Sequence, residues 1–310
     1  MKIGLMSALV ANDSMTFEQV ITDITDAEAR GFDFYALPNA FHIDAVTTLA
    51  IAGRRTATIE LLTGVVPIQP RHPHALAQQA LTAQLVCEGR FTLGIGVSHA
   101  VMMADMLGLA YERPAQQMRE YLAVLAPLLS LEKASSRGDF YRAQARLRIP
   151  QARPVKVIVA ALGPLMLDVA GAGAQGTFTW MTGPRTLAEF TIPRLLAAAK
   201  AAGQPSPRVV AGFPIALAQA SEDAIKRTQT TFDFYSRLPS YRHMLDREGV
   251  AHAGDLALIG NESALYGALR SLADHGVTDF AALPFDAETG ARARTLEWLA
   301  DIAPDFGAAG

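Results

Sequence analysis

Short apolar runs alternate along this chain with longer segments in which apolar residues recur at helical spacing. A bounded apolar run predicts a buried strand, and helical spacing predicts a helix that packs one face on the strands. The predicted strands are residues 2–9, 33–37, 59–66, 91–97, 155–161, 177–181, 208–218 and 278–283. The predicted helices are residues 16–30, 44–54, 73–88, 101–107, 114–129, 164–173, 186–202, 222–237, 240–248 and 262–275.

Eight strands in alternation with helices predict an α/β fold of the (β/α)8 TIM barrel type, with a doubly wound open sheet as the alternative. Residues 131–153 interrupt this alternation after the helices that follow the fourth strand, and they predict an inserted loop or hairpin. Because no linker-like stretch is present, we expect residues 1–310 to form one barrel domain, with a frayed tail at residues 307–310.

The loops that follow the strands form the chemical face of such a barrel, so polar residues there are candidates for function. The fourth predicted strand leads directly into Ser98 and His99, a hydroxyl and an imidazole. The other strand ends supply Ser7, Asn39, His42, Thr63 with Gly64 and Val65, Ala161 to Pro164, Met181 to Gly183, and Phe285.

Three of these features carry candidate chemistry. His99 has an ordinary pKa near neutrality, so it could donate or accept a proton, and a solvated or capping histidine is the alternative. His42 is a second acid–base candidate. The segment from Ala160 to Pro164 joins a strand to a helix, and the amides of a helix start suit an anion, although an ordinary turn is the alternative. Gly94 and Gly96 match a dinucleotide fingerprint poorly, because His99 holds the third glycine position.

Composition narrows the function classes. The net charge of −3 gives no support for binding to nucleic acid or to an anionic membrane. The single cysteine, Cys87, excludes an internal disulfide and is expected to be a buried, inert thiol. His72 and His74 have no neighbouring carboxylate, so no metal site is expected there. Without a leader-like start or an apolar run long enough to span a bilayer, the sequence predicts a soluble, cytoplasmic protein.

An ordered set of motifs between residues 2 and 285 resembles the luciferase-like monooxygenase superfamily, in particular its coenzyme F420-dependent oxidoreductase branch found in actinobacteria. The matching segments are Thr63-Gly64-Val65-Val66-Pro67, Arg71-His72-Pro73, residues 89–96, residues 108–114, Met118-Arg119-Glu120-Tyr121-Leu122, Ala160 to Pro164, and residues 179–187.

This resemblance implies a (β/α)8 barrel that binds a flavin-type cofactor at the C-terminal ends of its strands, and a homodimer. It also implies a non-prolyl cis peptide at Gly64–Val65 behind the deazaflavin ring, the cofactor phosphate and tail near the Ala160–Pro164 turn and Met181, and Ser98 and His99 at the ring edge. The cofactor-binding residues implied are Ser7, Thr63, Gly64, Val65, Ser98, Ala160, Ala161, Gly163, Pro164 and Met181.

Several deazaflavin-dependent members carry Asp-His at the end of the second strand, where this chain has Asn39-Ala40. We therefore expect His99 to move the proton, with His42 as second candidate and Ser98 as the orienting group. The predicted activity is hydride transfer between coenzyme F420 and a small organic substrate, in either direction. An FMN-dependent monooxygenase and a non-catalytic cofactor-binding protein are the alternatives.

Overall fold

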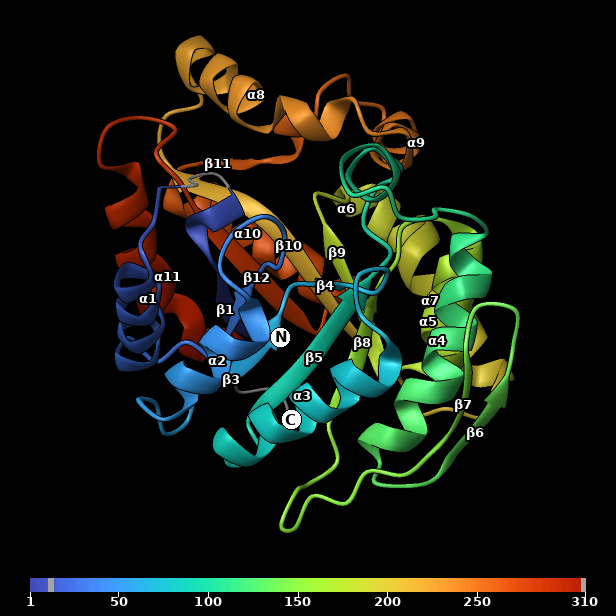
Figure 1. Cartoon of the computed structure of the whole chain (residues 1–310). Coiled ribbons are helices and arrows are strands. Elements are labelled where there is room, and N and C mark those ends of the chain that lie inside the picture. The colour runs from blue at the N-terminus through green and yellow to red at the C-terminus, as the bar shows by residue number, and fades with distance from the viewer. Residues whose placement is uncertain (11–13, 308–310) are drawn as a thin grey trace. The chain divides into compact units, whose positions relative to one another are not determined.

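The computed structural model describes residues 1–10 and 14–307 (Figure 1). The strands are β1 (Lys2–Met6), β2 (Phe34–Leu37), β3 (Glu60–Thr63), β4 (Val66–Pro67), β5 (Phe91–Gly96), β6 (Ala134–Arg137), β7 (Arg142–Ala145), β8 (Lys156–Ala160), β9 (Gly176–Trp180), β10 (Arg208–Leu217), β11 (Leu258–Gly260) and β12 (Asp279–Pro284). The helices are α1 (Phe17–Ala29), α2 (Ala45–Gly53), α3 (Pro73–Val86), α4 (Pro114–Leu129), α5 (Pro164–Gly173), α6 (Pro184–Thr186), α7 (Ile192–Ala201), α8 (Glu222–Ser236), α9 (Pro239–Glu248), α10 (Glu262–Asp274) and α11 (Ala291–Gly307).

The sheet closes on itself. Its strands are hydrogen-bonded in the order β10-β12-β1-β2-β3-β5-β8-β9, and β9 pairs again with β10. The pairs β1–β12, β1–β2, β3–β5, β5–β8, β8–β9 and β10–β12 are parallel. This is the connectivity of a (β/α)8 barrel, which confirms the predicted fold and excludes the doubly wound open sheet.

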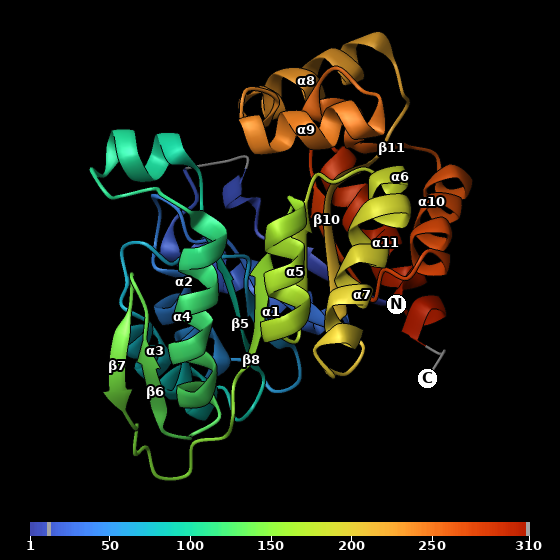
Figure 2. The ribbon, with the colours of Figure 1, turned by 90° about the vertical axis from the view of Figure 1, so that its right-hand side faces the viewer.

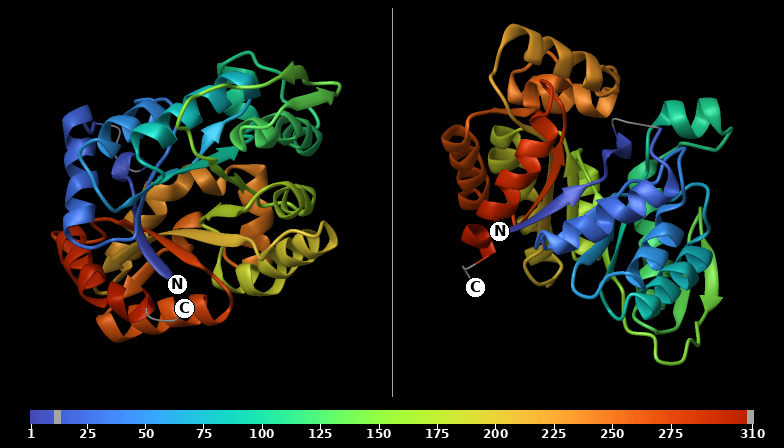
Figure 3. Two further views of the ribbon diagram at one scale, coloured as in Figure 1. Left: turned by 90° about the horizontal axis from the view of Figure 1, so that it is seen from below. Right: turned by 90° about the vertical axis from the view of Figure 1, so that its left-hand side faces the viewer.

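Two compact units share this ring, and the chain passes between them within β2, β9 and α7 and again just before β10. The first unit comprises Met1–Ala36, Thr179–Arg194 and Arg208–Gly310, and holds β1, β10, β11 and β12. In its core the rings of Phe213 and Phe280 stack with their centroids 6.1 Å apart. The amino group of Met1 donates to the carbonyl of Phe306, 2.9 Å away, so the N-terminus lies beside the end of α11 (Figure 3).

The second unit comprises Leu37–Phe178 and Leu195–Pro207, with helices α2 to α5 as a row of contacting neighbours (Figures 1 and 2). At the start of β5, Arg90 donates hydrogen bonds to Thr56 Oγ1 and to the carbonyls of Gly53, Thr56 and Ile59, at 2.9 to 3.1 Å. Cys87 is fully buried, and burial raises the pKa of its thiol to about 11, in agreement with the expected inert thiol.

The predicted insertion contains an antiparallel hairpin of β6 and β7, which lies along α4 (Figure 2). The Glu120 carboxylate on α4 accepts hydrogen bonds from the backbone amides of Phe140 (2.7 Å) and Tyr141 (3.3 Å). Partial burial alone would raise the pKa of Glu120, but these amides and the Gln116 side chain outweigh it and lower the pKa. The hairpin is therefore fastened to α4 by an ionised carboxylate.

Most predicted elements are observed within two residues of their expected bounds. The others differ. The first predicted strand, 2–9, ends at Met6, because Ala8–Val10 forms a 3-10 helix, and the third is broken into β3 and β4. The helix at 101–107 is a π-helical turn (Val101–Met106), and the helix at 186–202 begins at Pro184 and contains a π-helical turn (Leu187–Thr191). The strand β11 and the helix α11 were not predicted. Residues 308–310 of the expected frayed tail lie outside the described residues. Within the part of the chain that the structure covers, no helix is long and apolar enough to cross a membrane.

The break between β3 and β4 depends on two glycines of β5. A Cβ atom at Gly94 would lie 2.0 Å from the carbonyl oxygen of Thr63, and one at Gly96 would lie 2.8 Å from a methyl carbon of Val65. The Thr63 hydroxyl accepts from the Gly94 amide and donates to the Gly94 carbonyl, both at 2.8 Å. The two glycines are therefore explained by close packing of residues 63–65 on β5.

We predict that Gly94→Ala destabilises the folded protein by roughly 1–3 kcal/mol, because the methyl group must displace the Thr63 backbone. Urea unfolding would measure the change. Gly267→Ala is the matched control, because Gly267 lies in α10 and, apart from the helix's own neighbouring backbone, no atom of the described residues lies within 4 Å of a Cβ there. That variant should gain about 0.5–1 kcal/mol from helix propensity. Equal effects of the two substitutions would contradict the packing argument.

Candidate functional site

A cavity of about 290 Å³ opens in the second unit where three strands end. Its walls come from the loops after β2, β4 and β5, which is where parallel barrel strands place functional groups. The lining residues are Asn39, Ala40, Phe41, His42, Asp44, Pro67, Pro70, Arg71, Ser98, Met102, Met103 and Leu107. Apolar side chains dominate, with a few polar groups among them, as is typical of small-molecule sites.

An ion pair lies in this wall. Arg71 Nη2 is 2.5 Å from Asp44 Oδ2, and the other carboxylate oxygen of Asp44 accepts from the Thr47 amide at 2.8 Å, which caps α2. Burial alone would raise the pKa of Asp44, but the hydrogen bond from Thr47 and the Arg71 guanidinium outweigh it, so the pKa is lowered. Asp44 is therefore ionised at neutral pH, and the pair carries no net charge.

Ser98 stands at the end of β5 in a left-handed conformation, with φ of +55°. This conformation costs free energy for a residue other than glycine and is often found at functional sites. The Tyr111 hydroxyl donates to the Ser98 carbonyl (3.1 Å), and Ser98 Oγ lies 3.7 Å from Met102 Sδ. Met102 belongs to the π-helical turn, a helix type that also recurs at functional sites.

The structure brings His42 and Ser98 to the same cavity, whereas His99 lies outside the lining that the described residues form. His99 is half-buried, and its carbonyl accepts from the amides of Met102 and Met103 at 3.0 and 2.9 Å. Burial lowers the pKa of its imidazole, so His99 is neutral at pH 7. Asn39 accepts from the Ala45 amide at 2.9 Å and fixes the loop that carries His42.

The predicted cis peptide is present at Gly64–Val65. The Gly64 amide donates to the Leu37 carbonyl at the end of β2 (2.8 Å), and Thr63 is bonded to β5 as described above. Thr63, Gly64 and Val65 thus form one segment held between two neighbouring strands. This segment leads into β4 and on to Pro67 and Arg71 in the cavity wall.

The second predicted group lies where β8 passes into α5. β8 ends at Ala160, Ala161 is buried, and Gly163 is the N-cap of α5 with Pro164 as its first helical residue. Since the cap is glycine, it brings no side-chain oxygen to the first-turn amides. A Cβ atom at Gly163 would have no atom of the described residues within 4 Å, so there is open space at this helix start.

Ser7 and Met181 belong to the other unit. Ser7 is fully buried after β1, and its amide donates to the Ala36 carbonyl at 2.9 Å. Met181 is also fully buried, and its amide donates to the Gly212 carbonyl at 2.9 Å. Trp180 packs edge-on against Phe232 and Tyr235, with ring centroids 6.2 and 6.0 Å away, which is a core role.

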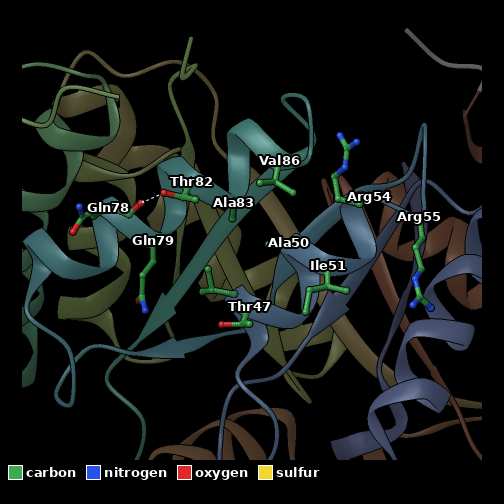
Figure 4. A pocket seen from close by; sticks show the side chains of 11 residues that line it. Thr47, Ala50, Ile51, Arg54, Arg55, Gln78, Gln79, Thr82, Ala83 and Val86 are labelled. Atoms are coloured by element: carbon green, nitrogen blue, oxygen red, sulfur yellow. Dashed lines mark hydrogen bonds between the residues drawn. The ribbon is translucent and has the colours of Figure 1, made fainter. Parts of the chain in front are cut away.

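Sequence reasoning missed the cavity role of Arg71, Asp44, Met102 and Met103. Asp44 was expected only as the first residue of the helix at 44–54, and Arg71 was part of a motif without a role. A signal was present, because both are charged residues placed a few positions after an apolar strand. A larger hollow of about 660 Å³ lies on the outer faces of α2 and α3 (Figure 4). Its titratable groups are Arg54 and Arg55, so it supplies no acid–base pair.

We predict that His99 titrates below its ordinary value of about 6.5 in the folded protein, because burial disfavours the imidazolium. The unfolded chain then binds more protons, so the contribution of His99 to stability is present above about pH 6.5 and is lost as the pH falls through the folded pKa. Histidine NMR titration would measure this, with His99→Gln to assign the resonance. A pKa at or above 6.5 would contradict the prediction.

Comparisons with known proteins agree with this architecture. Residues 3–301 match the family model described as luciferase-like monooxygenase. A coenzyme F420-dependent glucose-6-phosphate dehydrogenase of Intrasporangium calvum is 30% identical over 174 residues, covering 51% of this chain and 52% of the relative.

Two solved structures share the fold. The coenzyme F420-dependent tetrahydromethanopterin reductase of Methanopyrus kandleri aligns with a TM-score of 0.79 and 19% identity, over 98% of this chain and 99% of that one. The oxygenating constituent of 3,6-diketocamphane monooxygenase of Pseudomonas putida, in complex with FMN, aligns with a TM-score of 0.76 and 16% identity, over 98% of both chains. Since the family model spans nearly the whole barrel, this chain belongs to the luciferase-like monooxygenase family.

Proposed function

We propose that this chain is an oxidoreductase that transfers a hydride between coenzyme F420 and a small organic substrate. The observation that carries the proposal is the cavity at the ends of β2, β4 and β5, which combines apolar walls with His42, Ser98 and Arg71. The coenzyme F420-dependent relative, at 30% identity, favours the deazaflavin over FMN.

The residues present fit a cofactor that carries a phosphate group. The start of α5 has a glycine cap, open space at Gly163 and the partial positive charge of a helix N-terminus, which suits an anion. Ala160, Ala161, Gly163 and Pro164 would hold the phosphate end. Ser7 and Met181, in the first unit, stay separate cofactor-binding candidates. Thr63, Gly64, Val65 and Ser98 would hold the ring.

When bound, the deazaflavin would supply or accept the hydride, and the chain's own residues would do the rest. The apolar wall, with Met102 and Met103, would exclude water from the reacting atoms. An imidazole would take the accompanying proton in its neutral form and give it back in its protonated form. Its place in the cavity wall favours His42 over His99 for this step, with Ser98 as the orienting hydroxyl.

Titration of the purified protein with F420 and, separately, with FMN tests the cofactor. Fluorescence quenching would measure binding in both titrations. We expect micromolar or tighter binding of F420 and much weaker binding of FMN. The reverse preference, with oxygen consumption on addition of reduced FMN, would favour the monooxygenase alternative, to which the FMN-bound structural neighbour lends support. F420 binding without turnover on a broad substrate panel would favour a non-catalytic binding protein.

A matched pair of variants tests the phosphate position. Gly163 has φ of −80° and ψ of 160°, a conformation open to any residue, and both Asp and Asn are good N-caps. Gly163→Asp would put a negative charge beside the phosphate and should weaken F420 binding about tenfold or more. Gly163→Asn, with the same shape and no charge, should bind F420 more tightly than the Asp variant.

Thermal unfolding would show that both variants stay folded, because each adds a capping side chain in open space. Equal F420 affinity for Gly163→Asp and Gly163→Asn would contradict the proposal that the cofactor phosphate binds at the start of α5.

A further inference from the structure

Arg71 presents more hydrogen-bond donors to the cavity than the protein uses. A guanidinium has five N–H groups. Among residues 1–10 and 14–307, Asp44 is the one side-chain partner of Arg71, at 2.5 Å from Nη2. The Arg71 side chain is 22% exposed and forms part of the cavity wall. The donors other than the one on Asp44 have no side-chain acceptor among the described residues, and the exposed part of the side chain can reach a ligand in the cavity.

The backbone of Arg71 is held on both sides, and its guanidinium is held by Asp44. The Arg71 amide donates to the Ile68 carbonyl, and the Arg71 carbonyl accepts from the Tyr121 hydroxyl, both at 3.2 Å. Asp44 is itself fixed by the Thr47 amide at the start of α2. A donor that is already oriented loses little conformational freedom on binding, so its hydrogen bond adds directly to affinity.

Charge decides which acceptor fits. Asp44 already compensates the positive charge of Arg71, so the pair is neutral overall. A carboxylate ligand would meet no net positive charge at this ion pair, and it would lose part of its hydration against Met103, which is 3% exposed. A neutral carbonyl oxygen can accept from the guanidinium without leaving a net charge. The volume of about 290 Å³ limits the ligand to a small molecule.

We infer that Arg71 is a specificity-determining residue that selects small, largely apolar substrates with a neutral carbonyl oxygen, and that Asp44 sets this selectivity by neutralising the guanidinium. The inference rests on the proposed function, because it names the substrate class of that cavity. The contact between Arg71 and the carbonyl oxygen involves no atom of the cofactor, so binding of the carbonyl compound can be measured without the cofactor.

The probes are acetophenone, benzoate and ethylbenzene, which share one ring and differ in the acceptor. Ligand-observed NMR would give their affinities for the wild-type protein, for Arg71→Met and for Asp44→Asn. We expect the wild type to prefer acetophenone to both other probes. Arg71→Met should bind acetophenone about tenfold or more weakly and no better than ethylbenzene, because the charge-assisted hydrogen bond is lost.

Asp44→Asn keeps the helix cap, since Asn and Asp are equivalent N-caps, but it leaves the guanidinium uncompensated. This variant should gain about tenfold in benzoate affinity and come to prefer benzoate over acetophenone. Because it retains the cap, it tests the inference even where Arg71→Met fails to fold. Unchanged acetophenone binding in Arg71→Met, or unchanged benzoate binding in Asp44→Asn, would overturn the inference.

Titration of the same samples with F420 separates the two proposals. Arg71-dependent acetophenone binding without F420 binding would support the inference and reject the proposed cofactor. F420 binding with acetophenone affinity independent of Arg71 would reject the inference and leave the proposed function standing.

Discussion

The contact of residues 63–65 with β5 is the constraint on which the candidate site depends. Two glycines leave room for this segment to lie against the strand, and the Thr63 hydroxyl takes the place of a backbone partner for both polar groups of Gly94. The ladder of β3 therefore stops at Thr63 and resumes as β4, in register with Ile95 and Gly96. Pro67 ends β4 and Arg71 lies four residues further along the chain. The position of this part of the cavity wall is therefore a consequence of the packing of residues 63–65 on β5.

Arginine is used differently at the two ends of the strands. At the starts of two strands the guanidinium groups have several acceptors within the protein. Arg90 has four acceptors within the second unit, and Arg208 in the first unit is bound by both carboxylate oxygens of Asp279, at 2.7 and 3.2 Å. Beyond the end of β4, Arg71 has one side-chain partner among the described residues. In a barrel, residues at the N-terminal ends of the strands serve stability and residues at the C-terminal ends serve chemistry. The number of hydrogen bonds that these arginines make within the protein follows that division.

The sequence predicted the alternation of elements well because each buried strand is a bounded apolar run and each helix has a clear start, such as the Asp44 cap of α2. It failed at α11, where no strand follows to continue the alternation. Yet the buried residues Ala291, Thr295, Trp298 and Leu299 do recur at helical spacing. The π-helical turn at Val101–Met106 was expected only as a short helix. Over so few residues, the apolar spacing of a π-helix does not differ enough from that of an α-helix to be recognised in the sequence.

The candidate site was harder to predict than the fold, because a residue's place in a loop follows from contacts distant in sequence. Ser98 and His42 could be named from strand ends, but the approach of Arg71 to Asp44 joins residues 27 positions apart. The same limit applies to Asn39, which stands where several deazaflavin-dependent members carry an acidic residue followed by histidine. Its carboxamide oxygen is taken up by the Ala45 amide, so Asn39 shapes the loop. That loop places His42 in the cavity wall, so this chain, which has Ala40 at the position of that histidine, still carries an imidazole two positions further along the same loop.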